Sequence, residues 1–190
     1  MSFSRKIIVL DCGASRTALG VFSQQRGRLR LDRHEVEPFS APAGPGDEWV
    51  QRTKAALPKL RARLGRGGPC VLVWPGHAVL TKFLKVPSVK PDQRDRVIHF
   101  ESEQNLPIAL SELVWDSVIA GEHEAGLEVM LAASHRQKVE SLCTAARAAG
   151  FEPRCVLPAA WATLAAFRAV HDEPSRPAVV MNLGAYSTTF

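Results

Sequence analysis

The sequence lacks the features that mark a secreted, membrane-spanning or disulfide-bonded protein. Its 190 residues include four cysteines, none of them in C-x-x-C spacing, and each lies within an apolar run. No apolar run approaches the roughly 20 residues that span a bilayer. The polar start of the chain leads directly into a strand-like segment, without the apolar region of a signal peptide. We therefore expect a cytosolic protein whose cysteines are reduced and pack in the core.

Aromatic residues are also few, at 7% of the chain, although the net charge of +5 raises nucleic acid or anionic lipid as partners. Base stacking needs exposed aromatic rings. The basic stretch over residues 28–33 alternates with apolar residues, as in a strand with one solvated face. A solvated basic surface is therefore favoured, and neither nucleic acid binding nor direct membrane insertion is expected.

The chain has a regular α/β pattern at both ends. Apolar runs predict strands over 6–10, 17–23, 28–37 and 69–74, with a helix over 47–64 that Pro58 should kink or split. The run at 6–10 is the expected central strand, and the short turns after it predict that the first three strands form a meander. Later, a strand over 152–157, a nearly apolar helix over 158–170 and an apolar strand over 178–183 follow. That helix is expected to be buried between layers.

The middle of the chain changes character after Pro75-Gly76. A strand over 78–86, a helix over 91–105 and a hairpin formed by 113–120 and 127–133 predict a small α+β insert. A helix over 134–150 closes this block.

A small-residue turn follows the first buried strand. The candidates for phosphate binding there are Asp11, Gly13, Ser15, Arg16 and Thr17. Backbone N–H groups in such turns point into one concavity, and Asp11 could hold magnesium through water. Asp-x-Gly is also common in hairpin turns without any ligand, so a purely structural turn is an equal alternative.

A similar polar hairpin near the end of the sequence supplies Asn182, Gly184, Ala185 and Thr188. Two such hairpins would face each other across a cleft. Neither opens a helix with G-x-G-x-x-G, and the chain has no G-K-[ST], so Rossmann and P-loop sites are excluded.

The paired hairpins, separated by an alanine-rich helix that begins near Pro158, resemble the phosphate-1, connect-1 and phosphate-2 elements of the actin and sugar kinase superfamily. Within it, three features in sequence resemble PilM, the FtsA-like family of type IV pilus assembly. They are a helix ending in E-x-E-Q-x-h-P, then the motif h-x-D, then an apolar strand ending in two small residues. The resemblance implies an α/β actin-like ATPase (ribonuclease H-like) fold. Residues 1–77 and 151–177 would form subdomain 1A, 78–150 a 1C-type insert, and 178–190 the truncated start of a second domain.

The resemblance also implies a function. The protein would be a cytoplasmic scaffold, peripheral at the inner membrane, that binds the N-terminal peptide of a PilN-like partner in a type IV pilus or related secretion platform. The implied groove uses the 86–107 block and the insert hairpin, with Phe100, Gln104, Leu106 and Pro107 as contacts. Core packing of Phe100 and Leu106 is an equal alternative, and self-association stays open.

ATP and magnesium are the cofactors that the resemblance implies. The family usually has a lysine where this chain has Ala18, and an aspartate where it has Asn182. We therefore expect little or no hydrolysis by this chain. The alternatives are an ATP-hydrolysing FtsA-like or kinase-like protein, and the cytoplasmic domain of a GspL-type secretion protein.

Overall fold

The computed structural model describes residues 6–25, 28–41, 46–124, 126–171 and 175–189. The chain divides into two compact units, which are described separately. Unit 1 consists of Met1–His77 and Glu140–Phe190, and unit 2 of Ala78–Val139. The insert predicted from the sequence covers 78–150, so it begins where unit 2 begins but ends later. The structure assigns the part of the following helix after Val139 to unit 1.

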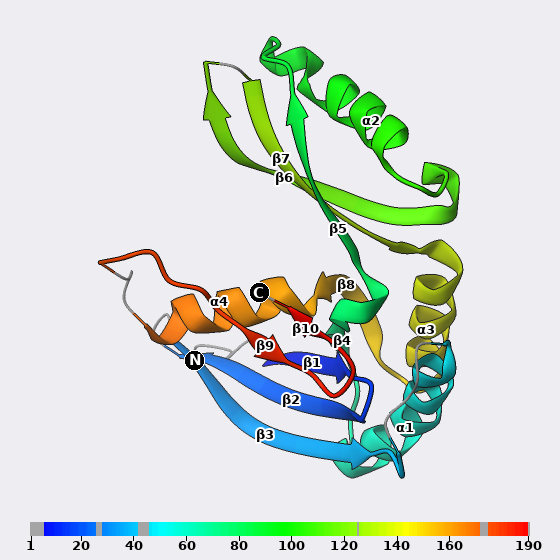
Figure 1. The fold of residues 1–190 in the computed structure, drawn as a ribbon. Coiled ribbons are helices and arrows are strands. Elements are labelled where there is room, and N and C mark those ends of the chain that lie inside the picture. Colours follow the sequence, from blue (N-terminus) through cyan, green and yellow to red (C-terminus); the bar gives the residue numbers. More distant parts are fainter. Residues whose placement is uncertain (1–5, 26–27, 42–45, 125, 172–174, 190) are drawn as a thin grey trace. The chain divides into compact units, whose positions relative to one another are not determined.

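Unit 1 is built on a five-stranded sheet in the order β3-β2-β1-β4-β8 (Figure 1). Strands β1 (Lys6–Cys12), β2 (Arg16–Gln25) and β3 (Arg28–Pro38) form an antiparallel meander. Strands β4 (Pro69–Trp74) and β8 (Glu152–Pro158) continue the sheet in parallel pairing. The first apolar run is therefore the central strand, as predicted.

Helix α1 (Glu48–Leu64) packs against β2 and β3 through one apolar face, which includes the fully buried Leu57 and Leu60. It runs through Pro58 without a break, so the expected split is wrong, whereas the alternative of a kink at Pro58 stays a prediction. Pro58 is exposed. Proline has no N–H, so one carbonyl group of the preceding helical turn lacks its usual hydrogen bond. Water can bond to this carbonyl group instead.

Helix α4 (Ala159–Val170) packs against β4 and β8, but none of its residues is buried, and Val170 is 76% exposed. The prediction that this helix is buried between layers is wrong for the described chain. Only one of its sides has a sheet to cover it. Helix α3 (Arg136–Ala148) precedes β8.

The apolar run over 178–183 is mostly not a strand. Only β9 (Asn182–Leu183) forms, and it pairs only with β10 (Thr188–Thr189). Val179 and Leu183 are 78% and 74% exposed. The predicted strand is therefore wrong in extent, because a buried strand needs neighbouring strands and a covering layer, and the described chain supplies neither here.

Unit 2 is a three-stranded antiparallel sheet in the order β5-β7-β6 with one helix on it. The strands are β5 (Leu80–Val86), β6 (Leu113–His123) and β7 (Gly126–His135), and the helix is α2 (Arg94–Asn105). Short 3-10 turns occupy Gly76–Ala78, Pro91–Gln93 and Leu110–Glu112. Ile98 of α2 packs with Leu84 and Val129 of the sheet.

The cysteines only partly follow the prediction. Cys12 and Cys70 are buried, and burial raises the pKa of the Cys70 thiol to about 11. Cys155 of β8 is exposed, so its predicted core position is wrong. None of the helices in the described ranges is long and apolar enough to cross a membrane.

Candidate functional site

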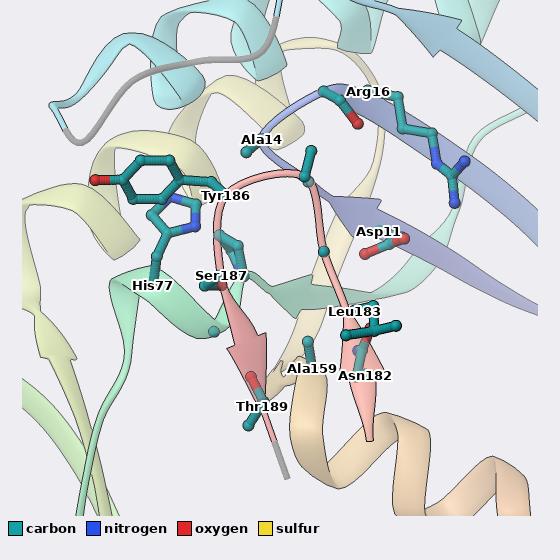
Figure 2. Close-up of a pocket in the computed structure, with 16 residues that line it drawn as sticks. Asp11, Ala14, Arg16, His77, Ala159, Asn182, Leu183, Tyr186, Ser187 and Thr189 are labelled. Carbon is teal, nitrogen blue, oxygen red and sulfur yellow. The ribbon is translucent and has the colours of Figure 1, made fainter. Parts of the chain in front are cut away.

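Unit 1 contains a cavity of about 210 Å³ where the first turn, the segment after β4 and the β9–β10 hairpin meet (Figure 2). The first turn follows β1, and β4 lies parallel to β1 with Asp11 beside Val73. The carboxyl ends of these two strands therefore open on one edge of the sheet, which is where ligands bind in many α/β folds.

The two turns that face the cavity have the same hydrogen bond. Gly13 N–H donates to the carbonyl of Arg16 at 3.0 Å, and Gly184 N–H donates to the carbonyl of Ser187 at 2.9 Å. A Cβ atom added to Gly13 would lie 3.0 Å from the Arg16 carbonyl oxygen, and one added to Gly184 would lie 2.7 Å from that of Ser187. Glycine is therefore the residue that each turn accommodates, and the resemblance between the two sequence patterns extends to their backbone.

Most of the predicted phosphate-binding residues line this cavity: Asp11, Gly13, Ser15, Arg16, Asn182, Gly184 and Ala185. Thr17 and Thr188 do not. Thr17 is fully buried, and its hydroxyl group donates to Thr53 Oγ1 of α1 at 3.4 Å. Because neighbouring residues of a strand point to opposite faces, Thr189 lines the cavity in place of Thr188.

Asp11 is the only carboxylate among the described residues that line the cavity. Burial raises the pKa of its carboxyl group, and the nearby positive charge of Arg16 lowers it in part. No cluster of three or more metal-ligating side chains occurs within the described ranges. One carboxylate suits a magnesium ion that keeps most of its water.

The volume of the cavity limits what it can hold. Sites for drug-sized ligands usually measure about 300–1,000 Å³. The described lining residues include hydroxyl groups and one arginine, which fit phosphate oxygens. The described residues therefore fit the phosphate groups of ATP, which would supply an anionic chain for them to hold, but not the whole nucleotide.

Asn182 connects the second hairpin to a helix. Its Nδ2 donates to Thr163 Oγ1 of α4 at 2.9 Å, and the Thr163 hydroxyl donates to the carbonyl of Ala159 at 2.8 Å. The amide that replaces the family's usual aspartate thus has a structural partner. A carboxylate could not donate this hydrogen bond.

Sequence reasoning missed Pro75, Gly76, His77 and Tyr186, all of which line the cavity. The sequence pattern presents Pro75-Gly76 only as the point where the chain changes character. The signal that could have revealed them is their position directly after β4, next to the strand that carries Asp11. The ring centroids of His77 and Tyr186 are 5.2 Å apart in an edge-to-face contact.

The predicted partner groove falls on unit 2, where its residues separate into two environments. Phe100 is 58% exposed, and Gln104 and Pro107 are exposed. Leu106 is buried in a core cluster with Leu113. Its assignment as a partner contact is therefore corrected to core packing, one of the two alternatives that the sequence left open.

Unit 2 also has a hollow of about 380 Å³ at the end of its sheet, with both apolar and charged lining residues. Its lining comprises Lys85, Val86, Pro87, His123, Gly126, Leu127 and Glu128. These residues lie where β5 ends and where β6 turns into β7. Both segments were named by the sequence as parts of the groove.

The comparisons with known proteins define first a class and then a family. A chain of a PilM–PilN type IV pilus biogenesis complex matches with a TM-score of 0.68 and 22% identity, over 85% of this chain and 50% of that one. The cytoplasmic domain of EpsL, an inner-membrane component of the Vibrio cholerae type II secretion system, matches with a TM-score of 0.59 and 10% identity. This match covers 81% of the present chain and 57% of the EpsL chain. These likenesses confirm the predicted α/β fold class of actin-like ATPases.

The family model for the type IV pilus assembly protein PilM matches residues 9–187. The chain therefore belongs to the PilM family, as the sequence pattern indicated. It spans about half the length of the solved chains that it matches. No curated protein sequence was found to match it.

Proposed function

We propose that the chain is part of a cytoplasmic scaffold, peripheral at the inner membrane, in which unit 2 binds the N-terminal peptide of a PilN-like partner. Membership of a type IV pilus assembly family supports this function. A relative of the same fold was solved as a PilM–PilN complex. The match with EpsL supports a related secretion platform as the second candidate.

The observation that carries this proposal is an exposed aromatic residue on the outer face of α2. Ile98 and Ser102 are buried on the inner face of this helix, whereas Phe100 is 58% exposed. Gln104 lies one helical turn after Phe100, so the two side chains share a face. Aromatic residues are enriched as anchors of protein interfaces.

The chemistry of this face suits an extended peptide. The Gln104 amide can both donate to and accept from a peptide backbone, while Phe100 offers apolar area to a side chain of the partner. The first residue of α2, Arg94, bonds to Glu122 of β6 at 2.5 Å. This ion pair fixes the start of α2 to the insert hairpin, so both parts of the proposed groove are held together.

The test is the affinity of the chain for a synthetic peptide with the N-terminal sequence of the PilN-like partner. We expect Phe100→Ala and Gln104→Ala to weaken binding about tenfold or more, which corresponds to at least about 1.4 kcal/mol. Both residues are exposed, so the free energy of unfolding should change by less than about 0.5 kcal/mol.

The matched control is Phe83→Ala. Phe83 is 68% exposed, but on β5 it alternates with the buried Leu84, so it points to the sheet face away from α2. Unchanged affinity in this variant is expected. Loss of binding in Phe83→Ala with full binding in Phe100→Ala would place the partner on the opposite face and overturn the proposed groove.

For unit 1, we propose that the cavity holds phosphate groups of ATP, with magnesium held through water by Asp11, and that this chain turns over little or no ATP. The shared turn geometry and the one carboxylate among the described lining residues support this combination. Calorimetric titration with Mg-ATP tests the binding.

A further inference from the structure

The β9–β10 hairpin forms one wall of the cavity without belonging to the main sheet of unit 1. Its strands have two residues each and pair only with each other. Leu183 is 74% exposed, so the hairpin has little apolar burial of its own. Two pairs of residues are too few to hold a hairpin in place in water. Other contacts must therefore hold it at the cavity.

One of these contacts is the hydrogen bond from Asn182 to Thr163 of α4, and the segment that follows β4 makes the others. A Cβ atom added to Gly76 would lie 2.5 Å from Thr189 Oγ1 and 3.5 Å from Ser187 Oγ. The side chains of Ser187 and Thr189 thus lie against Gly76. On the adjacent residue, the ring of His77 meets the ring of Tyr186 at 5.2 Å, and Figure 2 shows Tyr186 on the turn of the hairpin, beside His77.

A series of aromatic contacts connects His77 to the core of unit 1. His77 also contacts Trp49 edge-to-face at 5.7 Å, and Trp49 contacts Trp74 at 5.0 Å. Both tryptophans are 1% exposed. Because protein cores are close-packed and resist deformation, the position of His77 is set by the core of unit 1. The hairpin therefore rests on a rigid base through Gly76 and His77.

We propose that Gly76 is a positioning residue for the cavity: the absence of its side chain allows β10 to approach, and His77 then holds the turn through Tyr186. Any larger residue at position 76 displaces Thr189 and moves the second glycine turn away from the first. The turn Gly76–Ala78 contains the last residues of this part of unit 1 and the first of unit 2.

Hydrogen exchange measured by mass spectrometry tests this proposal without any ligand, so its outcome is independent of nucleotide and peptide binding. In Gly76→Ala, we expect the amides of residues 182–189 to exchange about tenfold faster than in the parent chain. The amides of β1, β2 and β4 should be unaffected. Gly46→Ala is the matched control, because no atom lies within 4 Å of a Cβ added there.

A second substitution distinguishes positioning from a general structural defect. Thr189→Ala removes the Oγ1 atom at 2.5 Å and leaves the Thr189 Cβ at 3.9 Å from the added atom, an ordinary contact. The double variant Gly76→Ala/Thr189→Ala should therefore recover the slow exchange of the parent chain. Failure of this rescue would overturn the role assigned to the Gly76–Thr189 contact.

Tyr186→Ala keeps the test decisive if Gly76→Ala does not fold, because Tyr186 is 45% exposed and its removal inserts nothing into the core. We expect faster exchange over residues 182–189 in this variant as well, with an unchanged melting temperature. Parent-like exchange in Tyr186→Ala would show that His77 does not hold the hairpin.

Discussion

The two glycine turns of unit 1 have the same backbone hydrogen bond but very different surroundings. The first joins β1 to β2, which pair over seven positions, and β1 also pairs with β4. The second joins β9 to β10, which pair over two. Three residues before its glycine, the first hairpin has Leu10, fully buried, and the second has Met181, 58% exposed. Local sequence therefore sets the turn, whereas the neighbouring strands set its rigidity.

This difference gives the cavity one wall built into the sheet and one wall held by side chains. Ligand binding would cost little reorganisation at the first turn. At the second, the contacts with Gly76, His77 and Thr163 must keep the hairpin in place. The following predictions compare matching positions of the two hairpins.

The largest difference is expected for the matched pair Leu10 and Met181. Leu10→Ala should lower the free energy of unfolding by about 2–5 kcal/mol, because it leaves a cavity in a close-packed core. Met181→Ala should change it by less than about 0.5 kcal/mol. Chemical denaturation measures both. Similar losses in the two variants would mean that the second hairpin is as well packed as the first.

A smaller difference is expected for Thr17 and Thr188, each four residues after its glycine. Thr17→Val removes the hydroxyl group that donates to Thr53 at 3.4 Å and leaves a buried polar atom without that partner. We expect a loss of about 1–2 kcal/mol, with phosphate-ligand affinity unchanged. Thr188→Val should alter neither quantity. If Thr17→Val kept the stability of the parent chain but bound the phosphate ligand more weakly, Thr17 would belong to the phosphate-binding site.

The pH dependence of stability should distinguish Asp11 from Asn182. Burial raises the pKa of the Asp11 carboxyl group, so ionising this group lowers the free energy of unfolding. The loss is absent below the ordinary carboxyl pKa of 3.8 and grows as the pH rises toward the raised pKa. Asp11→Asn should therefore raise the melting temperature at neutral pH, and the gain should shrink toward about pH 4. A gain that is constant with pH would contradict this assignment.

The substitution at the matching position of the second hairpin is Asn182→Asp. It removes the hydrogen bond that the amide donates to Thr163 at 2.9 Å. We expect faster hydrogen exchange in the hairpin, with the global free energy of unfolding changed by less than about 0.5 kcal/mol.

The smallest effect is expected in an assay of phosphate release from ATP. With one carboxylate in the described wall, the parent chain and Asp11→Ala should both give background rates, because the site lacks the charges that stabilise phosphoryl transfer. Release well above background in the parent chain that disappears in Asp11→Ala would make the first turn part of an ATPase site.

Much of the fold could be predicted from local patterns. The apolar run at the start of β1 identified the central strand, and the short turns after it predicted the antiparallel meander, because strands joined by tight turns pair with each other. The change after Pro75 marked the start of unit 2. The glycine turns were found because a turn with this close approach needs a residue without a side chain.

The errors concern burial, which one segment cannot decide alone. Helix α4 and the run before β9 are as apolar as core elements, yet they are exposed in the described chain because no second layer covers them. Thr17 matched the motif, but its hydroxyl group faces α1. The sequence pattern shows which residues alternate, but which face of a strand meets the cavity depends on the elements packed against it.

The sequence by itself determined the family, the strand order of the meander and the two glycine turns, because these depend on residues close together in the chain or on a family pattern. Only the tertiary structure decided which residues form the cavity. Parallel pairing of β4 with β1 brings Gly76 and His77, more than 60 residues after Asp11, to the same sheet edge. The approach of Thr189 to the bare backbone of Gly76 joins segments more than 110 residues apart, and only packing in three dimensions could place them in contact.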